Sequence, residues 1–182
     1  GLDATAPTSL NEAVSRSVRR TLVEVGALGQ AVADRNFRLV YQPVVDLKKS
    51  CAVHHHEVLV RFGDNASPFP MIRMAEELDL IEPLDIAVID RTIAKLVQDP
   101  TLRLAANISG RTITSPAFVE AVRTMLADNP KAQGRLLLEL TESAAIEDLA
   151  LADRHLQALR AEGILICLDD FGAGAASLAY LQ

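Results

Sequence analysis

The chain has 182 residues, of which 49% are hydrophobic and 23% are charged, and its formal net charge is −6. This length is sufficient for one globular domain with its own hydrophobic core. An acidic chain lacks the clustered cationic side chains that attract phosphates, so binding to DNA, RNA or an anionic membrane surface is not expected. Direct membrane insertion is not expected either. No apolar run approaches the ~20 residues that a membrane-spanning helix needs.

The two cysteines, Cys51 and Cys167, are too few for a disulfide framework and suit a reducing compartment. The N-terminus lacks the basic and apolar order of a signal peptide. We therefore expect a cytoplasmic location, which leaves open a membrane anchor of the parent protein in a segment before residue 1.

The first 35 residues divide into two parts. Residues 1–8 are expected to be a disordered lead, and residues 9–35 an amphipathic helix with apolar residues every three or four positions. These are Leu10, Val14, Val18, Leu22, Val25, Leu28 and Val32. Two roles remain open for this helix: it packs on the following domain, or it ends a signalling coiled coil that links that domain to another.

From residue 36 onward, predicted strands alternate with predicted helices. The strands span residues 37–45, 53–62, 102–109, 135–141 and 163–169. The helices span residues 71–79, 83–98, 115–128 and 145–161, and a last one begins near residue 176. Repetition of strand and helix indicates an α/β fold with a parallel sheet, either open or closed into a barrel.

The alternation of side chains divides each of the last four strands into two faces. One face is aliphatic and is expected to pack on helices. The other face carries oxygen-bearing side chains at or near the carboxyl end of each strand: Glu57, Asn107, Glu139 and Asp169, with Asp170 next in the chain. In a closed α/β barrel this face points inward, and active sites lie at its carboxyl-terminal rim. We therefore expect these groups to converge.

Converging carboxylates need a compensating charge. Two of them ~4 Å apart repel each other by about 4 kcal/mol at an effective dielectric of about 20, so protons or cations must offset the repulsion. Oxygen ligands favour Mg²⁺, Mn²⁺ or Ca²⁺ over Zn²⁺. Two cations bridged by a shared aspartate form the arrangement that stabilises both oxygens of a phosphoryl displacement.

Three consecutive histidines, His54, His55 and His56, lie on the second predicted strand. Because successive side chains of a strand alternate, they cannot all face one metal ion. His55 shares the inward face with Glu57 but lies one step deeper, so we interpret it as sheet filler or a solvent contact.

Five segments resemble, in order, those of the EAL domain family of cyclic di-GMP phosphodiesterases. They are YQPVVDL (41–47), HEVLVRF (56–62), NIS (107–109), LELTES (138–143) and LDDFGAGAASLAYL (168–181). The resemblance begins near residue 31 and implies a TIM-like (β/α) barrel whose first strand is antiparallel, with the EAL-like domain at residues 36–182.

The resemblance also implies roles for the matching residues. The expected ligands of two divalent cations are Glu57, Asn107, Glu139, Asp169 and Asp170. The cations would be Mg²⁺ or Mn²⁺, with Ca²⁺ as an inhibitory or structural substitute. The expected catalytic residues are Glu57, Asp169 and Asp170. The expected contacts of the dinucleotide are Gln42, Leu59 and Arg61. Glu142 would anchor the loop that follows Asp170.

The implied activity is metal-dependent hydrolysis of cyclic di-GMP to the linear dinucleotide in a bacterial signalling protein. The implied partners are a second copy of the domain and an upstream sensory or GGDEF-like domain. One departure from the family favours an alternative: Ala173, Ala175 and Ala176 replace a threonine, a tyrosine and a serine. The family's last three strands, with a lysine and further acidic residues, would lie beyond residue 182, so we expect the parent protein to be longer than this chain. The alternative is an inactive EAL-like domain that binds cyclic di-GMP or another protein.

Overall fold

The computed structural model describes residues 10–48, 52–63, 67–141, 146 and 148–169. The predictions for residues 1–8, for Glu142, for Asp170 with its alanine-containing loop, and for a helix near residue 176 lie outside these ranges. Of Asp169, only the backbone is described.

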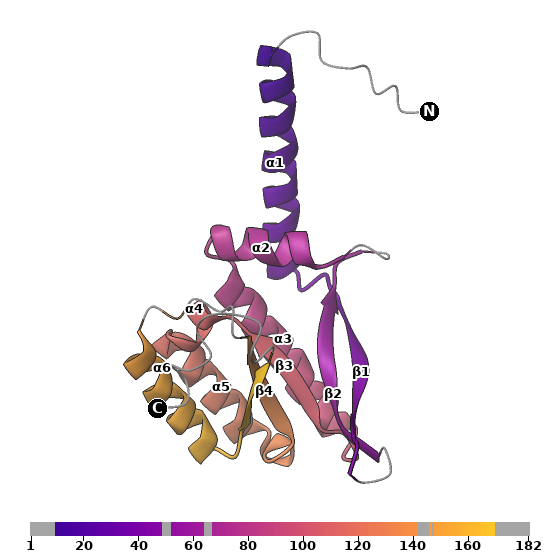
Figure 1. Cartoon of the computed structure of the whole chain (residues 1–182), viewed down its shortest axis with the longest axis vertical. Coiled ribbons are helices and arrows are strands. Elements are labelled where there is room, and N and C mark those ends of the chain that lie inside the picture. The colour runs from indigo at the N-terminus through magenta and orange to yellow at the C-terminus, as the bar shows by residue number, and fades with distance from the viewer. Residues whose placement is uncertain (1–9, 49–51, 64–66, 142–145, 147, 170–182) are drawn as a thin grey trace.

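Strands and helices alternate along the described chain as the sequence predicts (Figure 1). The strands are β1 (Arg38–Asp46), β2 (Ala52–Arg61), β3 (Leu104–Ile108), β4 (Leu136–Thr141) and β5 (Leu165–Asp169). The helices are α1 (Leu10–Ala33), α2 (Phe69–Glu77), α3 (Ile81–Gln98), α4 (Gly110–Ile113), α5 (Pro116–Asp128) and α6 (Leu149–Ala161), with a 3-10 turn η1 (Pro130–Ala132). The sequence did not predict α4 and η1, because a single turn is too short to show a hydrophobic period.

The five strands form one sheet in chain order. β1 and β2 are antiparallel, as predicted, whereas the three later pairs are parallel. The connection between β1 and β2 is too short for a crossover helix, and this restricts the pair to the antiparallel arrangement. The result is an α/β fold with a mainly parallel sheet.

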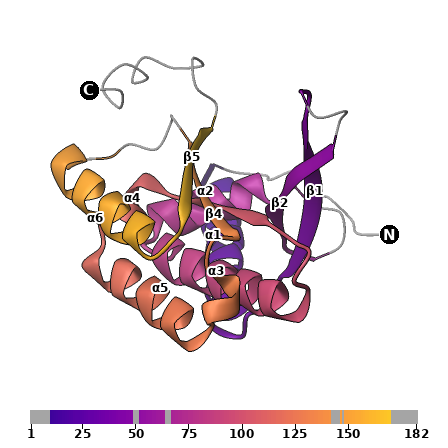
Figure 2. The same ribbon diagram turned by 90° about the horizontal axis from the view of Figure 1, so that it is seen from below.

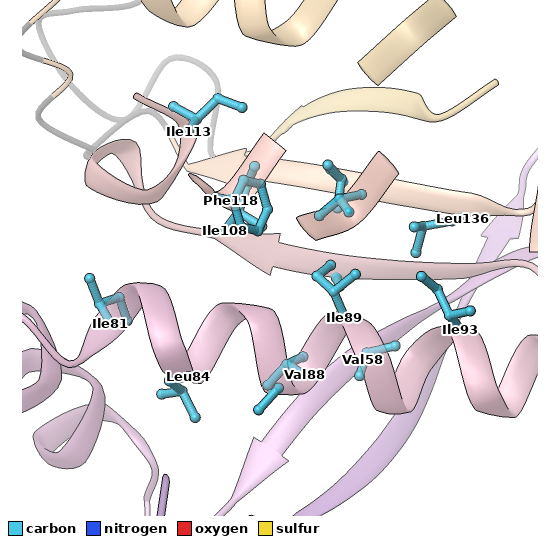
Figure 3. Close-up of a cluster of buried hydrophobic side chains, with 14 of the residues drawn as sticks. Val58, Ile81, Leu84, Val88, Ile89, Ile93, Ile108, Ile113, Phe118 and Leu136 are labelled. Atoms are coloured by element: carbon cyan, nitrogen blue, oxygen red, sulfur yellow. The ribbon is translucent and has the colours of Figure 1, made fainter. Parts of the chain in front are cut away.

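Helices α3, α5 and α6 lie along one face of this sheet (Figure 2). That face presents the aliphatic side chains that the alternation predicted, and they are buried: Val58, Leu104, Ala106, Ile108, Leu136, Leu138 and Leu140. Ile89 and Ile93 of α3 and Phe118 of α5 belong to the same cluster (Figure 3). Each large apolar side chain buried in this way contributes roughly 1.5–3 kcal/mol, so this layer holds the strands in place.

Helix α1 extends away from the other elements (Figure 1). At its carboxyl-terminal end, Leu28 and Val32 are buried in the core, whereas Val14, Val18 and Leu22 are more than half exposed. The packing role is therefore observed for the end of the helix, and the coiled coil stays a prediction for its exposed part. None of the described helices combines the length and the apolar character that crossing a membrane requires.

Asp85 is a buried carboxyl group of α3 that holds the turn directly after β3. Its Oδ2 accepts a hydrogen bond from the backbone N–H of Ser109 at 3.1 Å, and the Ser109 side chain caps α4 by accepting from the N–H of Thr112. Burial raises the pKa of Asp85 to about 7, although hydrogen bonds from Thr112 and Ser109 oppose the shift. Asp85 therefore fixes the chain two residues beyond Asn107.

This pKa predicts that stability depends on pH. Folding raises the pKa of Asp85 from 3.8 to about 7, so the folded protein favours the protonated carboxyl group. This contribution to the free energy of unfolding is complete below about pH 4 and is lost as the pH rises through about 7. The loss in the free energy of unfolding amounts to at most about 4 kcal/mol. Asp85→Asn keeps an acceptor for Ser109 and is expected to flatten the decrease, as measured by urea unfolding between pH 4 and 8. Asp128→Asn, at an exposed position of α5, should keep the original profile, and an unchanged slope in Asp85→Asn would contradict this role.

Candidate active site

The sheet face opposite the helices carries the polar side chains predicted for the site. Glu57 lies on β2, Asn107 on β3 and Glu139 on β4. Asn107 Nδ2 donates a hydrogen bond of 2.8 Å to Glu57 Oε1, and the strand register aligns Asn107 with Glu139. Residues aligned on neighbouring strands share a face of the sheet. Three predicted ligands thus lie next to one another on adjacent strands.

On strand β5, the predicted ligand Asp169 is described by its backbone alone. The β4–β5 register aligns Glu139 with Cys167 and Thr141 with Asp169. The Asp169 side chain, Asp170 and Glu142 lie outside the described part of the chain. Among the described side chains, no three His, Cys, Asp or Glu residues are arranged to hold a metal ion. The predicted ligand set therefore depends on the Asn107 amide and on Asp169 in addition to the two glutamates.

Glu139 is a buried carboxylate, and a histidine lies beside it. The Nε2 atom of His55 is 3.3 Å from Glu139 Oε1, and both side chains are about nine-tenths buried. Burial lowers the pKa of His55, and repulsion from His54, Arg103 and His56 lowers it further. The imidazole that faces Glu139 is therefore neutral at pH 7, and the pair is not a strong salt bridge.

A β-bulge in β2 places two of the consecutive histidines together. Val44 of β1 is aligned with His55, whereas Val45 is aligned with Val53, so His54 is the extra residue. The Nδ1 atoms of His54 and His55 are 2.8 Å apart. The strict alternation that the sequence analysis assumed for the histidines is wrong at this point, because the bulge interrupts it.

The residues predicted to contact the dinucleotide lie on β1 and β2. Gln42 is aligned with Glu57 in the antiparallel register and shares its face. Leu59 and Arg61 are half-buried, and the Arg61 guanidinium donates to the carbonyl of Val60 at 2.8 Å.

The register also reveals a residue that the sequence analysis missed. Arg38 of β1 is aligned with Arg61, and its guanidinium donates to the carbonyl of Gly63 at 3.3 Å. Two guanidinium groups on one end of a strand pair are suited to bind phosphate oxygens. The predicted antiparallel pairing was the available signal, but the pairing alone does not say which residues face each other.

A surface pocket of about 300 Å³ lies elsewhere, beside α3 and α4. Its lining includes Glu82, Arg111 and Ser115, and none of the three aligned site residues contributes to it. The candidate active site is therefore not this pocket but the face of the sheet opposite helices α3, α5 and α6.

The sequence profile of the EAL domain family matches residues 25–182. The chain belongs to the EAL domain family. The match covers strands β1 to β5 and therefore every residue of the candidate site on this EAL domain. It confirms the resemblance inferred from the five segments.

Two curated relatives of this EAL domain are named as cyclic di-GMP phosphodiesterases. PdeF of Escherichia coli is 30% identical over 177 residues, which are 93% of this chain and 23% of PdeF. PA2567 of Pseudomonas aeruginosa is 30% identical over 181 residues, which are 94% of this chain and 31% of PA2567. The chain thus spans less than a third of either protein.

Solved structures of EAL domains share the fold. The crystal structure of the EAL domain of Xanthomonas citri FimX in complex with cyclic di-GMP is 28% identical in sequence, with a TM-score of 0.79. The similarity covers 92% of this chain and 68% of the FimX chain. The α/β architecture predicted from the sequence is therefore that of an EAL domain.

The Asn107–Glu57 contact allows a test of whether this site binds cations. Asn107→Asp would replace a hydrogen bond by two facing carboxylates, which is expected to destabilise the protein by about 1–2 kcal/mol at this partly exposed position. Differential scanning fluorimetry should show a melting temperature lower by about 3–6 °C, and millimolar Mg²⁺ should restore it. Asn129→Asp, which changes an amide at the end of α5, should respond to Mg²⁺ no more than the wild type does. Failure of Mg²⁺ to restore Asn107→Asp would argue against a cation site here.

Proposed function

We propose that this EAL domain hydrolyses one phosphodiester bond of cyclic di-GMP to give the linear dinucleotide, with divalent cations as cofactors. The observation that carries the proposal is the hydrogen-bonded pair of Glu57 and Asn107 in register with Glu139. The two relatives named as cyclic di-GMP phosphodiesterases support the reaction and the substrate.

The donor set fits a divalent cation that prefers oxygen ligands. Asn107 donates a hydrogen bond to Glu57 through its Nδ2. Its Oδ1 is therefore available as a metal ligand next to the two glutamates. EAL phosphodiesterases are in general dependent on divalent metals, and we propose Mg²⁺ or Mn²⁺ here. A bound cation would neutralise the carboxylates and polarise the phosphoryl group. We propose Glu57, Asn107, Glu139, Asp169 and Asp170 as the residues that hold the cations.

The other residues would bind and orient the dinucleotide. Arg61 and Arg38 would donate hydrogen bonds to phosphate oxygens, because a planar guanidinium matches their geometry. Gln42 and Leu59 would contact the remainder of the nucleotide from the same two strands. The anchoring role of Glu142, the homodimer, the upstream domain and the cytoplasmic location stay predictions.

Turnover by the full-length protein that carries this chain tests the proposal directly. With cyclic di-GMP and either Mg²⁺ or Mn²⁺, we expect the linear dinucleotide as the product, measured by liquid chromatography. Glu57→Gln is expected to lower kcat by roughly 100-fold or more, since it removes a carboxylate from the cation site, and a chelator should abolish turnover. Glu77→Gln, at an exposed position of α2, is the matched control and should retain full activity.

The guanidinium of Arg61 predicts a different kinetic change. Loss of one charge-assisted hydrogen bond costs roughly 1.5–3 kcal/mol, so Arg61→Ala is expected to raise KM about tenfold or more. Arg61→Ala should lower kcat less than Glu57→Gln does, because the Arg61 side chain is proposed to bind the substrate rather than the cations. Arg73→Ala, at an exposed position of α2, should change neither constant. An unchanged KM in Arg61→Ala would remove this residue from the substrate site.

The alternative function is that of a cyclic di-GMP receptor without turnover. Ala173, Ala175 and Ala176 support it, because they remove hydroxyl groups from the loop after Asp170. The complex of the FimX EAL domain with cyclic di-GMP shows that this ligand binds to a related domain. Calorimetric binding of cyclic di-GMP without any product would establish the receptor, and absence of both binding and turnover would favour a role in protein contacts.

A further inference from the structure

The Nε2 atom of His55 lies close to a carboxylate without forming a hydrogen bond to it. Within the described part of the chain, this Nε2 is buried without a hydrogen-bond partner, although Glu139 Oε1 is only 3.3 Å away. The two atoms are close enough for a hydrogen bond but are not aligned for one. A buried polar atom without a partner costs roughly 1–3 kcal/mol, so a further group that binds this atom would stabilise the arrangement.

The other ring nitrogen of His55 does have a partner. Its Nδ1 is 2.8 Å from His54 Nδ1, a contact that exists because the bulge in β2 places the two rings side by side. When His55 donates in this pair, its Nε2 carries a lone pair that faces the acidic site. Histidines that bind metal ions show this pattern, with one nitrogen on the metal and the other N–H donated to a nearby acceptor.

The separation of the two unaligned atoms matches that of two ligands of one metal ion. Ligand atoms about 2.1 Å from a metal ion, at angles between the octahedral and tetrahedral values, lie roughly 3.0–3.4 Å apart. The distance of 3.3 Å between His55 Nε2 and Glu139 Oε1 falls in this range. Two ligands of one ion point at the ion rather than at each other, which accounts for the missing alignment.

We propose that His55 Nε2 joins Glu139 Oε1 as a ligand of a divalent cation, so that Co²⁺, Ni²⁺ or Zn²⁺ binds at this site more tightly than the Mg²⁺ of the proposed reaction does. Imidazole nitrogen suits these ions, whereas Mg²⁺ is bound by oxygen ligands and water. The inference rests on the proposed function in one respect, because Glu139 is a cation ligand in both. His54 acts as a positioning residue that holds the His55 ring.

Metal binding without any dinucleotide tests this inference in the full-length protein. The wild type and His55→Gln are compared by calorimetric titration with CoCl₂ and with MgCl₂. Glutamine is chosen because it can donate a hydrogen bond to Glu139 but supplies no imidazole. We expect Co²⁺ affinity to fall about tenfold or more, Mg²⁺ affinity to change less than threefold, and the visible absorption spectrum of bound Co²⁺ to change. His56→Gln, next in the chain and aligned with Pro43, should match the wild type. His54→Phe should weaken Co²⁺ binding severalfold.

Results that overturn this inference differ from results that overturn the proposed function. Equal Co²⁺ affinity and an equal spectrum in the wild type and His55→Gln would overturn the inference, as would an equal loss of Co²⁺ and Mg²⁺ affinity with a lowered melting temperature. A Mg²⁺-supported turnover that accompanies either result would leave the proposed function in place. Selective loss of Co²⁺ affinity in His55→Gln would support the inference even if no variant hydrolysed cyclic di-GMP, and that outcome would overturn only the proposed function.

Discussion

The register between the parallel strands β2, β3 and β4 is the constraint on which the rest of the site depends. It aligns Asn107 with Glu139 and allows Asn107 to reach Glu57. A slip of one residue would turn every side chain of a strand to the other face. Glu139 would then enter the aliphatic layer in place of Leu138, which is fully buried, and an uncompensated carboxylate there would cost several kcal/mol. The hydrophobic layer under the helices thus determines where the polar groups stand.

The helix layer also holds the ends of the strands that carry the site. Asp85 of α3 accepts from Ser109, directly after β3. At the opposite end, Arg135, just before β4, donates to the carbonyls of Leu96, Asp99 and Leu102. These carbonyls lie at the end of α3 and before β3, where the backbone lacks helical partners. Both ends of β3 are therefore tied to α3 by polar contacts, and this keeps Asn107 in a constant position.

Strand β2 combines three kinds of chemistry along its length. Arg61 carries a guanidinium, Glu57 a carboxylate, and His55 an imidazole whose Nε2 lies 3.3 Å from Glu139 Oε1. An oxygen-lined site would bind Mg²⁺, and an imidazole at its base shifts the balance toward ions that accept nitrogen. The same hydrolytic chemistry would then be available with a different preferred ion, because the carboxylates are shared.

Local patterns in the sequence determined the elements and the two faces of the sheet. The period of two in segments such as Leu136–Thr141 identifies both the buried aliphatic side and the side that carries Glu139, because alternation is a property of the strand itself. The five motifs likewise identified the family, since they are read without knowledge of contacts. The short helix α4 produced no period and was missed.

The tertiary structure decided what depends on partners distant in the chain. The bulge at His54, the alignment of Arg38 with Arg61 and the burial of Asp85 all follow from how one element meets another. A strand segment contains its own alternation but not the position of its neighbour, and a carboxylate in a helix does not show whether it will be covered. For that reason the common face of Glu57, Asn107 and Glu139 was predictable from the sequence, whereas the histidine beside Glu139 became visible only when the strands were aligned.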